Sequence, residues 1–230
     1  MGARTSEQKR QAAEHAATFI ESGMVVGLGT GSTAIHMVRR LAELLSAGQL
    51  RDIVCIATSN QTEDEARSLG ISMTTLEAHP VVDLTIDGAD EIDPQLNAIK
   101  GGGGALLREK IVAQASRRFM IVVDASKPSP QLGTHWALPV EVIPFGWGTQ
   151  RTFLTDLGAE VSVRSRADGQ PFQTDQGNMI LDCRFGPIAQ LHQLNDQLNR
   201  RVGIVEHGLF LDLVTDLIVA DKDGLRHIKR

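Results

Sequence analysis

Residues 24–33 read Met-Val-Val-Gly-Leu-Gly-Thr-Gly-Ser-Thr and predict an apolar strand, at 24–27, that runs into a loop of glycine and hydroxyl residues. After the loop, apolar residues recur at helical spacing, namely Ile35, Val38, Leu41 and Leu45. A strand, a glycine-rich loop and a helix in this order cradle a phosphate group, because the first N–H groups of the helix point at the loop. The stretch therefore predicts an α/β protein with a phosphate site.

The loop does not match the two common nucleotide-binding patterns. A P-loop has a Lys before its final Ser or Thr, and none is present here. The dinucleotide pattern Gly-x-Gly-x-x-Gly has Ser32 or Ala34 in place of its third Gly, so only its looser Gly/Ala form fits. Asp52 is a poor ribose partner because it precedes the next strand. We therefore interpret Thr30, Gly31, Ser32 and Thr33 as a monophosphate cradle, the alternative being a plain strand–helix turn.

Composition narrows the class of protein. With 230 residues, 42% hydrophobic and 22% charged, the chain is typical of a globular protein with one large domain or one domain and a smaller insert. The net charge of −5 argues against nucleic acid as a partner, and no apolar run reaches the ~20 residues of a membrane span. The polar N-terminus lacks the apolar core of a signal peptide, so we expect a cytoplasmic protein.

The cysteines and histidines do not indicate a metal or thiol chemistry. Cys55 and Cys183 lie in apolar, strand-like runs, so we expect buried free thiols. The seven histidines show no metal-site spacing, and we expect no metal.

Strands and helices alternate up to about residue 127. We expect a first helix that Ser6 caps and Gly23 stops, running to about Ser22. The polar turn Thr58-Ser59-Asn60 is expected to cap another helix, which ends near Gly70. Further strands are expected at 53–57, 71–74, 81–86 and 119–123. This alternation predicts a Rossmann-like sheet of mainly parallel strands.

An acidic run follows the strand expected at 81–86. Four carboxylates lie within residues 87–93, and the ligand crevice of an open parallel sheet lies at the carboxyl ends of its strands. We predict that Asp87 and Asp90 face that crevice. Glu91 and Asp93 are assigned to solvent or to supporting roles.

Residues 100–111 read Lys-Gly-Gly-Gly-Gly-Ala-Leu-Leu-Arg-Glu-Lys-Ile. Successive glycines allow a ligand to approach the main chain closely. A helix with one apolar face is expected to follow, formed by Ala105, Leu106, Leu107, Ile111 and Val112. Because Lys100 and Glu109 bracket the run, we interpret it as a ligand site rather than a flexible loop. Lys127, just after the strand at 119–123, either reaches an anion in the same crevice or is an ordinary surface lysine.

From residue 134 the regular alternation of strands and helices ends. Residues 138–146 contain two prolines and predict a linking segment. After it we expect helices at 149–157 and 188–199, strands at 159–164 and 179–184, extended segments at 202–205 and 209–210, and a closing hairpin of 217–220 and 225–228. The pattern predicts a small plait-like α+β domain over 134–205, appended to a Rossmann-like catalytic domain of 1–133 plus 206–230.

Together these motifs resemble the type A family of ribose-5-phosphate isomerases over nearly the whole chain. The matching segments are 29–34, 87–92, 100–103 with 108–111, 124–127, 139–144, and 174–175 with 177–178. One such motif alone would be a weak signal, whereas several in order at compatible spacing are highly specific.

The resemblance implies an aldose–ketose isomerase of the non-oxidative pentose phosphate pathway that interconverts ribose 5-phosphate and ribulose 5-phosphate without metal or cofactor. It implies a proton acceptor at Glu109, and a dimer or tetramer whose chains have a Rossmann-like domain and a small α+β domain. The substrate-binding residues that it implies are Thr30, Gly31, Ser32, Thr33, Asp87, Gly88, Ala89, Asp90, Lys100, Gly101, Gly102, Gly103 and Lys127.

The chemistry of these residues agrees with that reaction, which moves a proton between C1 and C2 through an enediolate. Glu109 would be the base, and Lys100 would stabilise the enediolate. Asp87 or Asp90 would open the sugar ring and pass protons between oxygens, and the division between them stays open.

Two other functions are compatible with the fold. The first is a non-catalytic sugar-phosphate sensor, against which stand the negative charge and the lack of an appended helix-turn-helix. The second is a nucleotide-dependent dehydrogenase or an acyl-CoA enzyme, against which stands the loop at 27–33.

Overall fold

The structure, a computed structural model, describes residues 2–230 and their side chains from Thr5 onward. The chain forms two compact units: the first is Met1–Ala89, Arg108–Lys127 and Leu213–Arg230, and the second is Asp90–Leu107 and Pro128–Asp212. The second unit thus includes residues 90–107, which precede the predicted boundary. The division into a catalytic domain of 1–133 plus 206–230 and a small domain of 134–205 stays a prediction.

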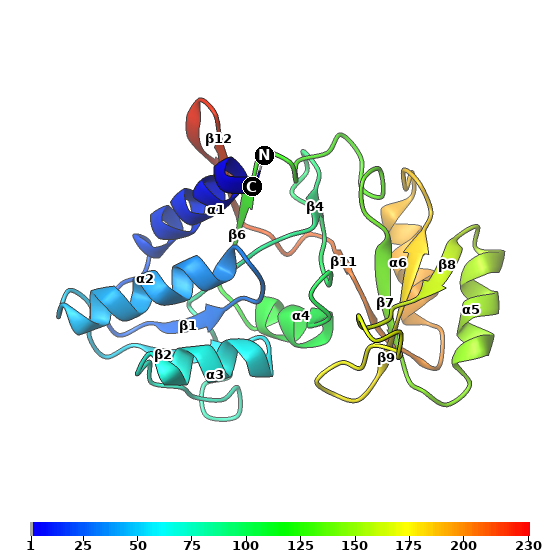
Figure 1. Cartoon of the computed structure of the whole chain (residues 1–230), viewed down its shortest axis with the longest axis horizontal. Helices are drawn as coiled ribbons and strands as arrows, with labels where there is room; N and C mark the ends of the chain where they lie inside the picture. Colours follow the sequence, from blue (N-terminus) through cyan, green and yellow to red (C-terminus); the bar gives the residue numbers. More distant parts are fainter. Residues whose placement is uncertain (1) are drawn as a thin grey trace. The chain divides into compact units, whose positions relative to one another are not determined.

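The first unit is built on a mainly parallel sheet in the strand order β13-β12-β6-β3-β1-β2 (Figure 1). Its strands are β1 (Val25–Leu28), β2 (Val54–Ala57), β3 (Leu84–Asp87), β6 (Phe119–Asp124), β12 (Asp216–Asp221) and β13 (Gly224–Lys229). Among the described strands only β13 runs antiparallel in this sheet, because it closes the predicted C-terminal hairpin with β12. The Rossmann-like sheet is therefore confirmed. The strand predicted at 71–74 is wrong, since Met73 makes only an isolated bridge with Cys55.

Helices cover both faces of this sheet, namely α1 (Gly2–Ala17), α2 (Ala34–Ser46), α3 (Asn60–Ser68) and α4 (Leu106–Gln114). Alternate strand residues point to opposite faces. Val26 and Leu28 of β1 join the core cluster that contains the buried side chains of α1 and α2. Ile56 of β2 packs with Val112 of α4 in a separate cluster. The helices α1 and α2 therefore lie on one face and α4 on the other.

Two predicted helices differ from the observed ones. The helix α1 begins at Gly2 and ends at Ala17, so the predicted start at Ser6 and end near Ser22 were wrong. It ends early because the N–H groups of 18–20 each bond the carbonyl three residues back, which tightens the chain into turns. On α4, the predicted apolar face was wrong at Ile111, which is 44% exposed.

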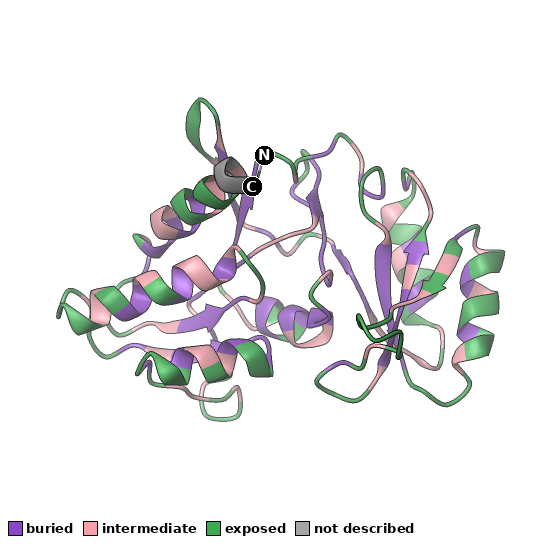
Figure 2. Cartoon of the chain, viewed as in Figure 1, coloured by how far each residue is buried: buried purple, intermediate pink, exposed green. Residues whose placement is uncertain are grey.

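The second unit contains an antiparallel sheet in the order β10-β7-β9-β8 and a small sheet in the order β11-β5-β4. The strands are β4 (Glu91–Ile92), β5 (Ala98–Ile99), β7 (Leu138–Val142), β8 (Glu160–Val163), β9 (Met179–Arg184), β10 (Ile204–His207) and β11 (Leu209–Phe210). The helices α5 (Trp147–Asp156) and α6 (Leu191–Asn199) pack on one face of the larger sheet, and Figure 2 shows their outer sides exposed. The predicted α+β fold of the small domain is confirmed, whereas its bounds stay a prediction.

The strand β7 overturns the prediction of a linking segment at 138–146. It is an inner strand of its sheet and pairs with β9 and β10 despite Pro139. The carbonyl of Pro139 accepts the N–H of Gly208 at 2.8 Å, and Gly208 lies just beyond the end of β10. The N and O atoms of a strand residue point to the same side, so the missing N–H of Pro139 would face the carbonyl of Gly208. That carbonyl accepts the N–H of Lys100 at 2.9 Å instead, so the proline leaves no acceptor unpaired.

The other face of the larger sheet carries a buried carboxyl group, Glu141 of β7. Its Oε1 accepts hydrogen bonds from Thr174 at 2.8 Å and from Asn178 at 2.9 Å, whereas its Oε2 is buried without a hydrogen-bond partner. Burial raises the pKa of the Glu141 carboxyl, even though the two hydrogen bonds lower it. The charged form is therefore less favourable in the folded state than in the unfolded chain.

We expect Glu141→Gln to raise the Tm near neutral pH by a few degrees. A raised pKa in the folded state means that this carboxyl favours folding at low pH and loses that contribution as the pH rises above its unfolded value. Glutamine keeps the accepting oxygen and removes the buried charge. Thermal unfolding should show a gain of roughly 2–4 °C at pH 7.5, which shrinks toward pH 4. The exposed Glu160→Gln on β8 is the control, and a lower Tm of Glu141→Gln at pH 7.5 would contradict the expectation.

Candidate functional site

The predicted phosphate loop lies at the point in the sheet where the direction of strand order reverses. The strand β1 has β2 on one side and β3 on the other, so the loops that follow β1 and β3 leave the same edge. Thr30, in the loop after β1, donates its N–H to Oδ1 of Asp87, the last residue of β3, at 3.1 Å. Within the first unit, the structure thus brings together Thr30–Thr33 and Asp87.

Close packing explains why residue 29 is glycine. A Cβ atom on Gly29 would lie 2.3 Å from Oδ1 and 2.5 Å from Cα of Asp87. Gly31 has a φ of +106°, which favours glycine for conformational rather than steric reasons. The glycines therefore serve the contact between the loop and Asp87.

A cluster of hydroxyl groups anchors the loop to the start of α3. Thr30 Oγ1 hydrogen-bonds with Thr58 Oγ1 and Ser59 Oγ, each at 2.8 Å, and with Thr62 Oγ1 at 3.2 Å. Ser59 caps α3 by accepting the N–H of Thr62, as the sequence predicted. The Thr30 hydroxyl thus holds the loop in place, while Ser32 is the exposed hydroxyl of the loop.

One further residue at the loop was missed by the sequence analysis. Lys9 of α1 donates from Nζ to Ser32 Oγ at 3.0 Å. A signal existed, because Lys9 stands three and four positions before the buried Ala12 and Ala13, on the face of α1 that packs on the core. A lysine at such a position needs an explanation, and the phosphate loop provides one.

Glu109 lies on α4, and its helical position is unusual for a carboxylate. Successive residues of a helix turn by about 100°, so the buried Leu106, Val112 and Ala113 flank Glu109 on one side of α4. Ile111 lies roughly opposite. Glu109 is only 4% exposed, and the buried face of α4 therefore contains the candidate base near its middle.

Lys127 follows β6 in a turn that Asp124 fixes. Asp124 is buried, and its Oδ1 accepts hydrogen bonds from the N–H of Ser126 at 2.8 Å and from its hydroxyl at 2.5 Å. The N–H of Lys127 bonds the carbonyl of Asp124 at 3.2 Å. Lys127 is half-buried, so the structure does not present it as a fully exposed surface lysine.

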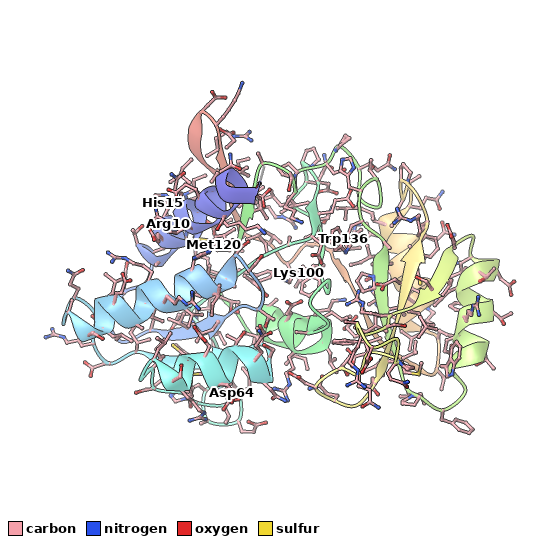
Figure 3. All side chains as sticks on the ribbon, viewed as in Figure 1. Arg10, His15, Asp64, Lys100, Met120 and Trp136 are labelled. Carbon is pink, nitrogen blue, oxygen red and sulfur yellow. The ribbon has the colours of Figure 1, made fainter. Side chains whose placement is uncertain are left out.

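The second unit holds Asp90 and the glycine run. Asp90 precedes β4 and its Oδ2 accepts the N–H of Gly102 at 2.7 Å. A Cβ on Gly102 would lie 2.5 Å from Asp90 Oδ1. Lys100, labelled in Figure 3 just after β5, is 2% exposed and its Nζ lies 5.5 Å from the ring centroid of Phe210. Within the second unit, the structure thus joins Asp90 to the segment Lys100–Gly103.

Glu91 has a supporting role that excludes the solvent alternative. It is fully buried, and its carboxylate accepts four successive N–H groups, those of Gly133, Thr134, His135 and Trp136, at 3.0 to 3.3 Å. These charge-assisted bonds tie the loop at 133–136 to β4. Asp93 is also buried and accepts the N–H groups of Gln95 and Asn97, so it stabilises the turn between β4 and β5.

Among the described residues, no cluster of three or more His, Cys, Asp or Glu side chains is arranged to hold a metal ion. In the same part of the chain, none of the helices combines the length and the apolar character needed to cross a membrane.

Comparison with known proteins identifies similar sequences. The profile of the family described as "Ribose 5-phosphate isomerase A (phosphoriboisomerase A)" matches residues 54–224. "Ribose-5-phosphate isomerase A" of Chloroflexus aurantiacus is 56% identical over 97% of this chain and 94% of its own length. "Probable ribose-5-phosphate isomerase 2" of Arabidopsis thaliana is 48% identical over 96% of this chain and 85% of its own length.

Solved structures agree with the sequence comparison. A D-ribose-5-phosphate isomerase in complex with phospho-erythronic acid superposes with a TM-score of 0.96 at 36% identity, covering 98% of this chain and 99% of that one. The ribose 5-phosphate isomerase of Plasmodium falciparum gives a TM-score of 0.95 at 39% identity with the same coverage. The similarity spans both units.

Proposed function

Because the chain belongs to the ribose 5-phosphate isomerase A family, we propose an assignment of residues to the steps by which it interconverts ribose 5-phosphate and ribulose 5-phosphate. The observation that carries the proposal is Glu109, a carboxylate near the middle of the buried face of α4. Burying a carboxylate on a helix face that could have been apolar is unfavourable, so its presence there indicates a functional role.

Glu109 is the general base at carbon. In the direction from aldose to ketose, its carboxylate removes the proton from C2 of the open-chain sugar, which forms the enediolate. The same proton is then delivered to C1 to give the ketose. No atom is gained or lost, so one base can serve both half-reactions. A site that excludes water favours this return of the proton to carbon.

Lys100 and the glycine run stabilise the developing oxyanion. The ammonium group of Lys100 and the main-chain N–H of Gly103 supply positive charge and a hydrogen bond where the enediolate forms. Asp87 and Asp90 accept and return the protons of the sugar hydroxyls during ring opening and between the two oxygens. Gly88, Ala89 and Gly101 shape the main chain next to these groups.

The phosphate is bound by the loop Thr30–Thr33 at the start of α2. Main-chain N–H groups at the beginning of a helix attract a phosphate, and Ser32 is the exposed hydroxyl of the loop. Lys9, which contacts Ser32, and Lys127 supply positive charge. Holding the phosphate orients the sugar for the proton transfer.

Lysine-to-alanine variants test the phosphate assignment. We expect Lys9→Ala and Lys127→Ala each to raise the KM for ribose 5-phosphate about tenfold, and the KI of inorganic phosphate to rise with it, while kcat falls less. The reason is the loss of one charge-assisted contact that is equal in ground and transition states. Assays contain EDTA, since the proposal uses no metal or cofactor. Lys222→Ala, in the exposed β12–β13 turn, is the control. An unchanged KM for either variant would show that this lysine does not bind the phosphate.

We also propose a cytoplasmic homodimer or homotetramer, on the strength of the resemblance to the family. Light scattering of the purified protein at assay concentration tests the assembly, and a monomer that is fully active would contradict it.

A further inference from the structure

Arg164 stands at a junction of the second unit that no step above uses. It follows β8, and its main-chain N–H bonds the carbonyl of Ile180 on β9 at 2.9 Å, while its own carbonyl accepts the N–H of Phe172 at 2.8 Å. The guanidinium forks onto Asp182 of β9, with Nε at 3.0 Å from Oδ2 and Nη2 at 2.5 Å from Oδ1. The side chain is only 14% exposed. Backbone pairing and a bidentate ion pair therefore fix its position.

The remaining nitrogen of Arg164 reaches the glycine run. Nη1 donates to the carbonyl oxygen of Gly101 at 2.7 Å and to that of Gly102 at 3.1 Å. At the last residue of the run, a Cβ on Gly104 would lie 2.4 Å from the ring of Phe172. The same ring lies 6.0 Å from the Arg164 guanidinium carbon. The guanidinium and the ring thus hold the glycine run against the sheet.

The geometry of the peptide bond fixes the direction in which the N–H groups of Gly102 and Gly103 point. In a planar trans peptide the C=O and the next N–H point in opposite directions. The Gly101 carbonyl points at Arg164, so the Gly102 N–H must point away from it, and this N–H indeed donates to Asp90 Oδ2 at 2.7 Å. The Gly102 carbonyl also points at Arg164, so the Gly103 N–H is turned toward the side on which Asp90 lies.

We propose that Arg164, held by Asp182, is a positioning residue that keeps the Gly102 N–H on Asp90 and turns the Gly103 N–H toward the enediolate. The proposal rests on the role assigned above to Lys100–Gly103. The positive charge next to the two carbonyls also polarises their peptide groups, which makes each N–H a stronger donor. Without the clamp, four successive glycines have few preferred backbone angles of their own, and the N–H groups would have to be ordered during the reaction.

The test replaces the planar guanidinium group of Arg164 by the ammonium group of lysine. Lysine cannot bond both carbonyls and a carboxylate in fixed geometry, so we expect Arg164→Lys to lower kcat about tenfold and to raise the KI of phospho-erythronic acid by a similar factor. The carboxylate of that acid mimics the enediolate, and contacts made in the transition state act on both quantities. The KI of inorganic phosphate should stay within about twofold, since the phosphate loop is not affected.

Two companion variants make the result decisive. Arg166→Lys, two residues along the same hairpin with an exposed ion pair to Asp168, should match the wild type. Asp182→Asn removes the carboxylate that holds the Arg164 guanidinium, and it should raise the KI of phospho-erythronic acid as Arg164→Lys does. It provides the test if Arg164→Lys fails to fold. A variant that loses turnover but keeps the wild-type KI for the acid has only a smaller active fraction, and this outcome would overturn the proposal.

Lys100→Ala, measured in parallel, separates the positioning role of Arg164 from the catalytic role of Lys100–Gly103 on which it rests. Wild-type turnover in Lys100→Ala would remove the catalytic role of the glycine run and the inference with it. An impaired Lys100→Ala beside a normal Arg164→Lys would leave the proposed function standing and reject the positioning role alone.

Discussion

Glu109→Gln is expected to lower kcat by at least ~10², with the KM for ribose 5-phosphate changed by no more than a few fold. Glutamine has nearly the same shape as glutamate and occupies the same buried position on α4, but it cannot take a proton from carbon. Steady-state kinetics measure the loss. The variant should also stop the transfer of deuterium from C2 of labelled ribose 5-phosphate to C1 of the product, because that transfer requires a base.

Two variants separate this chemical effect from a structural one. Glu109→Asp keeps a carboxylate one methylene farther back and should retain more activity than Glu109→Gln. Glu63→Gln on α3, where the carboxylate makes a surface ion pair with Arg67 at 2.6 Å, should match the wild type. Near-normal turnover of Glu109→Gln would remove Glu109 from the role of base.

Gly29→Ala is expected to reduce kcat/KM by roughly 10² or more, because a misplacement of about 1 Å in a positioning group is enough for such a loss. The added Cβ would lie 2.3 Å from Asp87 Oδ1 and 2.5 Å from its Cα. Main chain cannot yield like the end of a flexible side chain, so the phosphate loop and Asp87 must move apart. The hydrogen bond from Thr30 to Asp87 would be stretched in the process.

Stability should change less than activity in this variant. Overpacking a close contact costs about 1–3 kcal/mol, which corresponds to a Tm loss of several degrees in a protein of this size. Gly148→Ala on α5 is the matched control, since its Cβ would meet nothing within 4 Å and alanine is the better helix former. A kcat/KM of Gly29→Ala within threefold of the wild type would show that the close approach at Asp87 does not matter for function.

Local sequence was sufficient where a residue acts through its immediate neighbours. The strand, loop and helix at residues 24–45 follow from hydrophobic spacing and from glycines whose conformations other residues disfavour. Ser59 was recognisable as a helix cap for the same reason. The acidic run at 87–93 and the glycine run at 100–104 were predicted to be functional segments because neither pattern favours a packed core, and this role stays a proposal.

Long-range packing decided the cases in which the prediction was wrong or incomplete. Pro139 suggested a break in the chain, but β7 continues through it because the opposite carbonyl, that of Gly208, is bonded to the N–H of Lys100 instead. Ile111 was expected inside and is exposed, since the buried face of α4 includes Glu109 instead. A period of 3.6 residues describes a helix, but it does not say which side faces the sheet.

Residue type and short spacing were enough to predict the mainly parallel sheet, the α+β unit and the family, and to propose the segments of the chain that carry chemistry. Only the tertiary structure decided which side chains serve those segments from a distance. Lys9 contacts Ser32, 23 residues along the chain, and Arg164 holds the carbonyls of Gly101 and Gly102 from the far end of another sheet. The physical reason is that a hydrogen bond depends on distance and angle in space, and sequence separation fixes neither once the chain has folded.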